Sequence, residues 1–255
     1  LVSVLGLVPE MKEIEQLCDK YKIILIEDVC ESIGSLYNNK KLGNFGLMSV
    51  FSTFFVHQIT TIEGGFINTN DMKLYNLLLM LRSHGWARDT NKSYQYMQKS
   101  KWSIDNFNEQ FTFYVPGFNV RSTEINAFLG LQQMERIEEI IKQRNINYNL
   151  YNKLINNTYW KPKETIHFVS NMAYPVIHPR RNEITDKLIK NNIETRPLIC
   201  GSLGSQPFVI KHLNGGKILN NAEMITHNGF YVPNHLDLSE DDIYKISNII
   251  NDVIC

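Results

Sequence analysis

A histidine, His57, follows an apolar run that extends from Val50 to Val56. The β-branched and aromatic residues of this run favour a buried strand. The pair Gly64-Gly65 predicts a tight turn into a second strand. A histidine at the end of a buried strand is rigidly held, partly shielded from water and able to exchange a proton near neutral pH. The stretch 49–71 therefore predicts acid–base chemistry at His57, with an ordinary packed histidine as the alternative.

A carboxylate, Asp28, comes two residues after the apolar run Ile23–Ile26. Open α/β sheets bind their ligands at the carboxyl ends of parallel strands, which is where this side chain is expected. A carboxylate in such a place can keep the ring nitrogen of a pyridine-type cofactor protonated, so that the ring accepts electrons. The alternative is that Asp28 caps the N-terminus of a following helix.

The elements that carry these side chains begin with a predicted βαβ unit. Residues 1–8 and Ile23–Ile26 read as strands, the second buried on both faces, and Met11–Tyr21 reads as the helix between them. We expect a right-handed crossover between the two strands. Farther on, Asp71 is predicted to cap a helix, and residues 90–112 are predicted to form a long loop. The predicted buried stripe of that helix consists of Leu74, Leu77, Leu78 and Leu81.

A second, smaller α+β domain is predicted from about residue 146. Ser122 is expected to cap a long helix that connects the first domain, residues 1–145, to this second domain. The strands of the second domain are predicted over 167–176 and 193–199, with a helix over 183–190. Ser239 is expected to cap the final helix, with Asp242 at the capping-box position. The predicted apolar face of this helix consists of Ile243, Ile246, Ile250 and Val253.

The central stretch resembles a known family. Ser52, His57 and Glu63-Gly64-Gly65 match, in register, the cofactor-lysine segment of the DegT/DnrJ/EryC1/StrS-type sugar aminotransferases. These are fold-type I enzymes of nucleotide-sugar metabolism that depend on pyridoxal phosphate. His57 stands at the lysine position, and no lysine occurs between Lys41 and Lys73. The histidine resembles one branch of the family, the 3-dehydratases of 4-keto-6-deoxy nucleotide sugars, in particular those acting on GDP-4-keto-6-deoxy-D-mannose.

The resemblance implies roles for three residues near His57. Asp28 would bind the nitrogen of the cofactor ring, and Glu31 would lie near its phenolic oxygen. Ser52 would contact the cofactor phosphate; its alternative role is a local hydrogen bond within the strand.

Two more distant residues also receive roles from the resemblance. Asn119, in the segment GFNVRSTE, would reach the cofactor phosphate of a neighbouring subunit, which implies a homodimer with composite sites. Arg196 would bind a phosphate or hydroxyl group of the substrate; its alternative role is an interdomain salt bridge.

The implied fold is α/β and fold-type I aminotransferase-like. It has a mixed, mostly parallel sheet flanked by helices and a smaller C-terminal α+β domain. Relatives carry a further N-terminal stretch before the equivalent of Leu1, and we expect this chain to lack its natural beginning. In the family that stretch supplies a phosphate-binding loop at a helix N-terminus.

The resemblance also implies a reaction. Histidine shuttles protons but forms no lasting covalent bond to the cofactor, so pyridoxamine phosphate would be held non-covalently, with glutamate as the amine donor. The implied activity is a 3-dehydratase (lyase) of dideoxysugar and lipopolysaccharide biosynthesis. Two alternatives remain open: a pseudoenzyme resembling nucleotide-sugar 4-aminotransferases, and a non-catalytic partner subunit.

Composition limits the other possibilities. The 255 residues are 43% hydrophobic, enough for one or two cores, and 26 basic residues balance 26 acidic ones. Zero formal charge argues against a nucleic-acid partner. No apolar run approaches the roughly 20 residues of a membrane span, and no secretion signal is recognised. We expect a cytoplasmic protein without a metal site or iron–sulfur cluster, because its cysteines are scattered: Cys18, Cys30, Cys200 and Cys255.

Overall fold

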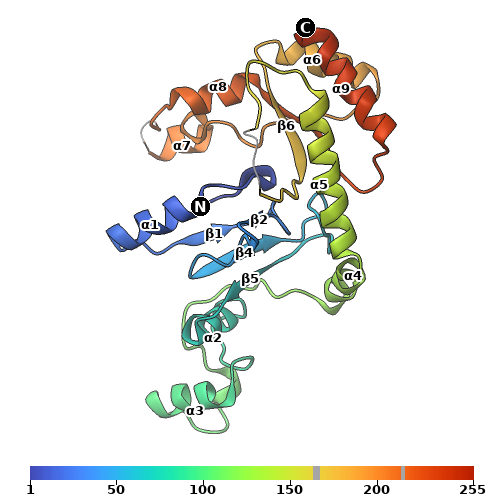
Figure 1. Ribbon diagram of the computed structural model, residues 1–255. Coiled ribbons are helices and arrows are strands. Elements are labelled where there is room, and N and C mark those ends of the chain that lie inside the picture. The colour runs from blue at the N-terminus through green and yellow to red at the C-terminus, as the bar shows by residue number, and fades with distance from the viewer. Residues whose placement is uncertain (163–166, 214–215) are drawn as a thin grey trace.

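The computed structural model describes residues 1–162, 167–213 and 216–255. Figure 1 shows an α/β body built on two separate sheets, with α2 and α3 extending from the sheet that contains β4 and β5. The long helix α5 (Ile137–Leu154) runs from the level of this sheet to that of β6. No helix among the described residues is both long and apolar enough to cross a lipid bilayer.

The first sheet has the strand order β1-β4-β5. β1 (Ile26–Asp28) pairs in parallel with β4 (Met48–Ser52), and β4 pairs antiparallel with β5 (Gly65–Thr69). The sheet is therefore mixed, as the family fold implies. Helix α1 (Met11–Tyr21) precedes β1 at the predicted position, and a short hairpin, β2 (Leu36–Tyr37) and β3 (Lys40–Lys41), lies between β1 and β4.

The predicted βαβ unit needs correction at both strands. Residues 1–8 form no continuous strand: Val2 makes a single parallel bridge to Asp28, and a 3₁₀ turn follows, η1 (Val4–Gly6). The next strand begins at Ile26, after Lys22 ends α1 in the left-handed conformation. Residues 23 and 24 are exposed rather than buried on both faces, because no described segment covers them.

The strand predicted from Val50 to Val56 ends earlier, at Ser52. The backbone N–H of Thr53 donates to the Gly64 carbonyl at 3.0 Å, and the chain then leaves the sheet. The apolar residues of 54–56 belong to a loop, because the strand pairing closes at Ser52 opposite Gly65.

Helix α2 (Met72–Leu81) confirms the predicted cap. Asp71 Oδ1 accepts the N–H groups of Lys73 at 2.8 Å and Leu74 at 3.0 Å. The four leucines of the predicted stripe are only partly buried, and the fully buried residues of the helix are Asn76, Leu79 and Met80. The predicted loop 90–112 contains helix α3 (Lys92–Lys101) and a 3₁₀ turn, η2 (Glu109–Phe111). α3 buries no residue, so its sequence lacks the apolar periodicity from which a helix is predicted.

The single helix predicted after Ser122 is two helices. α4 (Glu124–Met134) begins one residue later than expected, with Thr123 as its cap, and the chain breaks at 135–136 before α5. α4 buries no side chain, whereas α5 buries a face that reaches into the second sheet's core. The predicted boundary at 145/146 falls within α5, and the division into two domains stays a prediction.

The second sheet has the order β6-β8-β7 and is antiparallel throughout. β6 (Ala173–Ile177) and β7 (Arg196–Pro197) lie within or near the predicted strands but are shorter, and β8 (Gly229–Pro233) joins them. The helices of this region are α6 (Arg181–Lys190), α7 (Pro207–His212), α8 (Asn220–Asn228) and α9 (Glu240–Ile254), with a 3₁₀ turn, η3 (Leu203–Ser205). Ser239 and Asp242 form the predicted capping box of α9.

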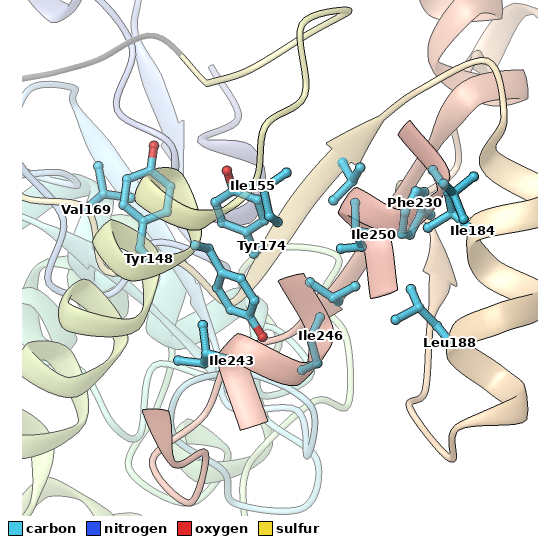
Figure 2. Close-up of a cluster of buried hydrophobic side chains, with 14 residues drawn as sticks. Tyr148, Ile155, Val169, Tyr174, Ile184, Leu188, Phe230, Ile243, Ile246 and Ile250 are labelled. Carbon is cyan, nitrogen blue, oxygen red and sulfur yellow. The ribbon is translucent and has the colours of Figure 1, made fainter. Parts of the chain in front are cut away.

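The largest core lies around this second sheet. Figure 2 shows buried side chains of α5, α6, α9 and the β6–β8 pair converging on one another. Tyr151 and Tyr174 stack with ring centroids 4.9 Å apart, and Ile243, Ile246 and Ile250 of α9 pack beside them. The predicted apolar face of α9 is therefore confirmed. Burial of this cluster fixes α5 as a rigid support between the two sheets.

Candidate active site

His57 lies on a closed loop, residues 53–64, between β4 and β5. Three hydrogen bonds join the two ends of this loop: Thr53 N to Gly64 O at 3.0 Å, Thr61 N to Thr53 O at 2.8 Å, and the two threonine hydroxyls to each other at 2.6 Å. Gly64 takes a φ of +148°, and a Cβ on Gly65 would lie 2.5 Å from the Phe51 carbonyl oxygen. The glycine pair is therefore required where the loop returns to the sheet.

The half-buried ring of His57 is held by the turn that follows β1, the strand that carries Asp28. His57 Nδ1 lies 2.5 Å from the carbonyl oxygen of Cys30, and the backbone N–H of His57 donates to Phe54 O at 3.0 Å. Because a carbonyl only accepts, Nδ1 carries the hydrogen. Nε2 is then the atom of the neutral ring that can take up a proton.

Asp28 is half-buried at the carboxyl end of β1, as predicted. Its Oδ1 accepts the backbone N–H of Cys30 at 3.1 Å, and the residues that follow, 29–35, form turns and no helix. The alternative of a helix cap is therefore wrong. Burial, followed by the hydrogen bond with Asp28, raises the pKa of the Cys30 thiol to about 12, so this thiol stays protonated beside the carboxylate.

Glu31 belongs to the same turn, and its carboxylate holds the N-terminal segment. Oε2 accepts the N–H of Leu5 at 2.5 Å, and Leu5 has a positive φ of 52°. Burial raises the pKa of Glu31, while the Leu5 N–H and the neighbouring His57 act in the opposite direction.

Ser52 stands at the last paired position of β4, opposite Gly65. Its hydroxyl oxygen accepts the N–H of Phe54 at 3.1 Å, which corresponds to the local role considered from the sequence. The hydroxyl hydrogen is still available to an external oxygen, because the bond to Phe54 uses only an acceptor lone pair.

An open pocket of about 260 Å³ lies between the His57 loop and the second sheet. Its lining includes Val56, which precedes His57, and residues of α5, β7, β8 and the segment after β8: Arg144, Arg196, Tyr231, Asn234 and His235. Burial raises the pKa of Tyr231, Arg196 lowers it, and Glu31 raises it. The pocket is thus electrostatically connected to the turn that contains Glu31.

Arg196 reaches this pocket, and its ion pair among the described residues is a local one. Its Nη2 lies 2.7 Å from Glu194 Oε1, two residues earlier in the same segment, and the hydrogen bond to Glu194 raises the pKa of Arg196. The interdomain alternative is wrong, because the partner lies on the same short strand segment. Both side chains are substantially exposed, so the pair can open at little cost.

Asn119 lies apart from these residues. Its segment is fixed to the end of α2: Phe118 N donates to Leu81 O at 2.6 Å, His84 N to Phe118 O at 2.7 Å, and Asn119 bridges Ser83. The side chain is exposed. None of the hydrogen bonds or pocket residues described above links Asn119 to the other predicted site residues.

Two supporting residues escaped the sequence analysis. Glu27, which is 1% exposed, accepts three backbone N–H groups: Gly43 at 2.7 Å, Phe45 at 2.6 Å and Gly46 at 2.7 Å. Its position beside Asp28 was a usable signal, because adjacent strand residues face opposite sides. Asn126 is the other; its amide contacts the His57 loop at 2.7 and 3.2 Å, which no local pattern reveals.

Comparison with known proteins identifies the family of this chain. The model of the DegT/DnrJ/EryC1/StrS aminotransferase family matches residues 1–251. The chain is 34% identical to the GDP-4-keto-6-deoxy-D-mannose 3-dehydratase of Yersinia pseudotuberculosis over 260 residues, covering 98% of this chain and 64% of the relative. The enzyme of the same name from Escherichia coli O55:H7 is 34% identical over 257 residues, covering 98% and 66%.

Solved structures show the same fold. The Escherichia coli GDP-4-keto-6-deoxy-D-mannose 3-dehydratase with bound hydrated pyridoxal phosphate superposes with a TM-score of 0.85 at 31% identity, over 98% of this chain and 66% of that one. The Helicobacter pylori aminotransferase PseC gives 0.82 at 27% identity, over 98% and 64%. The chain belongs to the DegT/DnrJ/EryC1/StrS aminotransferase family, and it spans slightly less than two thirds of the length of these relatives.

Proposed function

We propose that this chain provides the catalytic histidine and the ring-nitrogen carboxylate of a 3-dehydratase that acts on a 4-keto-6-deoxy nucleotide sugar. The observation that carries the proposal is the position of His57. It occupies the loop that holds lysine in related aminotransferases, and its Nδ1 is anchored on the Cys30 carbonyl, so that Nε2 is the atom left for proton transfer. The two dehydratases at 34% identity support the same reaction.

The residues present fit a pyridoxal-type cofactor. Asp28 offers a half-buried carboxylate at a strand end, where it can hold a protonated ring nitrogen, and Ser52 offers a hydroxyl for a phosphate oxygen. Such a cofactor supplies an amine for the sugar ketone and an electron sink. His57 Nε2 would take up a proton from the amine-bearing carbon of the cofactor and deliver it to the C3 hydroxyl of the sugar, which would leave as water.

The two alternatives have less support. A transaminase reaction needs a lysine in this loop, and none occurs between Lys41 and Lys73. A non-catalytic subunit has no need to bring His57 and Asp28 together, yet both contact Cys30. We further propose glutamate as the amine donor, Arg196 as a residue that binds an anionic group in the adjoining pocket, and a homodimer in which Asn119 serves the partner's site.

A direct assay tests the dehydratase proposal. The chain, mixed with pyridoxal phosphate, L-glutamate and GDP-4-keto-6-deoxy-D-mannose, is expected to form 2-oxoglutarate and a 3-deoxy sugar product, both measured by mass spectrometry. His57→Asn should abolish the sugar product while cofactor binding, followed by absorbance, is retained. Net transfer of nitrogen to the sugar, or equal product from His57→Asn, would contradict the proposal.

A further inference from the structure

The turn that closes the His57 loop is strained at one residue. Ile62 has a φ of +72°, a left-handed conformation that a β-branched side chain strongly disfavours. Such a conformation persists only where surrounding groups hold it in place. The backbone carbonyls on either side of Ile62, those of Thr61 and Glu63, show which group does so.

Both carbonyls are bound by a single side chain from α4. Asn126 Nδ2 donates to Thr61 O at 2.7 Å and to Glu63 O at 3.2 Å, so its two N–H bonds span the strained residue. Asn126 Oδ1 meanwhile accepts the backbone N–H of Thr123 at 3.2 Å and its hydroxyl at 2.5 Å. Every hydrogen-bonding group of the amide is therefore used, with the donor facing the loop and the acceptor facing the helix cap.

The helix is shaped to make this approach possible. Gly130 lies one turn beyond Asn126, and a Cβ at Gly130 would lie 3.0 Å from the Thr61 side-chain methyl. Thr61 also closes the loop through its bonds to Thr53, and it donates from Oγ1 to Glu63 O at 3.0 Å. Asn126 therefore contacts the residues that close the loop on which His57 lies.

From this arrangement we infer that Asn126 is a positioning residue for His57. It holds the Thr61–Gly64 turn and so fixes the loop that presents the ring to Cys30. The inference rests on the proposed function for its catalytic part, and on geometry alone for its effect on the loop. Asn126 touches no reacting atom; it acts through the backbone of residues 53–64.

Two variants separate this role from helix capping. Asn126→Asp keeps the acceptor that caps α4 but replaces the donor with an oxygen that repels both carbonyls. Thr123→Ala removes the other half of the capping box but leaves the Asn126 donor in place. Gln132→Ala, exposed on the same helix, serves as the surface control. Asn126→Ala, which removes the donor without adding repulsion, is the second test should Asn126→Asp fold poorly.

The first readout is hydrogen exchange of residues 53–64, measured by mass spectrometry on the full chain. We expect Asn126→Asp to speed exchange in this segment about tenfold, while Thr123→Ala and Gln132→Ala leave it unchanged. Equal exchange in Asn126→Asp and the unmodified protein, or the same increase in Thr123→Ala, would overturn the inference.

The second readout is the split between kcat and KM in the dehydratase assay. A displaced His57 lowers kcat, by about tenfold or more, and leaves KM within about twofold, because the substrate contacts remain. Faster exchange with an unchanged kcat would remove the positioning role. A chain that turns over no nucleotide sugar would instead defeat the proposed function, and hydrogen exchange would then decide the role of Asn126 by itself.

Discussion

At the scale of single residues, the site depends on the short turn after β1. The backbone N–H of Cys30 donates to the Asp28 carboxylate, and its carbonyl accepts from the His57 ring, so one residue orients both side chains. Its thiol takes no part in acid–base chemistry near neutral pH, since burial raises its pKa to about 12. Substitution of the thiol is therefore less informative than substitution of the two side chains that its backbone orients.

His57→Lys should change how the cofactor is held. The loop around His57 matches that of lysine-bearing relatives, so a lysine there is expected to bond covalently to pyridoxal phosphate. The purified variant should retain cofactor after borohydride reduction and denaturation, as judged by intact mass, and the unmodified protein should not. Covalent cofactor in the unmodified protein would contradict the assignment of His57.

Asp28→Asn tests the ring-nitrogen carboxylate. The two side chains are nearly isosteric, so the fold and the hydrogen bond from Cys30 N should survive. Loss of the negative charge should slow dehydration by about a hundredfold or more, while cofactor affinity changes little. Single-turnover dehydration and the thermal midpoint measure the two effects. An unchanged rate would exclude Asp28 from the site.

Glu31→Gln should change the pH dependence of stability. Burial raises the pKa of Glu31 in the folded chain, so the charged carboxylate lowers the stability of the folded state. Because the folded state binds the proton at a higher pH than the unfolded state does, this loss is recovered as the pH falls toward the unfolded-state pKa. Glutamine can still accept the Leu5 N–H without that charge. The variant should therefore be slightly more stable than the unmodified protein at pH 7. This advantage should vanish below the ordinary glutamate pKa of about 4.3, as thermal midpoints at both pH values would show.

At the scale of elements, α5 supports the wall of the pocket through Arg144. This side chain is 6% exposed, and its Nη1 donates to the carbonyls of Asn171, Met172 and Asn234. Burial lowers the pKa of Arg144 to about 10, and among the described residues it has no carboxylate partner. The arginine therefore acts as a clamp between α5 and the ends of β6 and β8.

Arg144→Met should destabilise the fold, because it leaves buried carbonyls without donors. We expect a loss of about 2 kcal/mol or more in the free energy of unfolding, measured by urea denaturation. Lys142→Met, exposed on the same helix, is the matched control and should change stability by less than about 0.5 kcal/mol. Equal stability of the two variants would show that the carbonyls find other partners.

At the scale of the whole molecule, two exposed features could meet a second copy of the chain. The side chain of Asn119 is exposed, and α4 exposes Ile125, Phe128, Leu131 and Met134. An isologous dimer places such features reciprocally, so each Asn119 could serve the other subunit's site.

Mixing two inactive variants tests this arrangement. If Asn119 acts across the interface, a mixed dimer of His57→Asn and Asn119→Ala contains one intact site. Random mixing should then restore about a quarter of the activity of the unmodified protein. If Asn119 acts within its own chain, every site in the mixture is defective and no activity returns. A monomer with full cofactor affinity, detected by analytical ultracentrifugation, would exclude the dimer itself.

Local features of the chain were predictable because they depend on residues that are close in sequence. The Asp71 cap and the Ser239–Asp242 capping box are hydrogen bonds across two or three residues. The period of apolar residues predicted α1 and the buried face of α9. The spacing from Ser52 to Gly65 was enough to indicate the family, because this short stretch has to build strand, loop and turn in a fixed order.

The rest required tertiary structure, because it depends on pairing between distant segments. Parallel pairing of β1 with β4 brings Cys30 to His57 across 27 residues, and no local pattern contains that contact. The antiparallel pairing of β4 with β5 ends β4 at Ser52, opposite Gly65, and closes the loop. Asn126 reaches the loop from 65 residues away in sequence, and α3 forms without any apolar period. The residue types at the site could thus be predicted from the sequence. Their mutual geometry was decided by the sheet register and by the packing of α4.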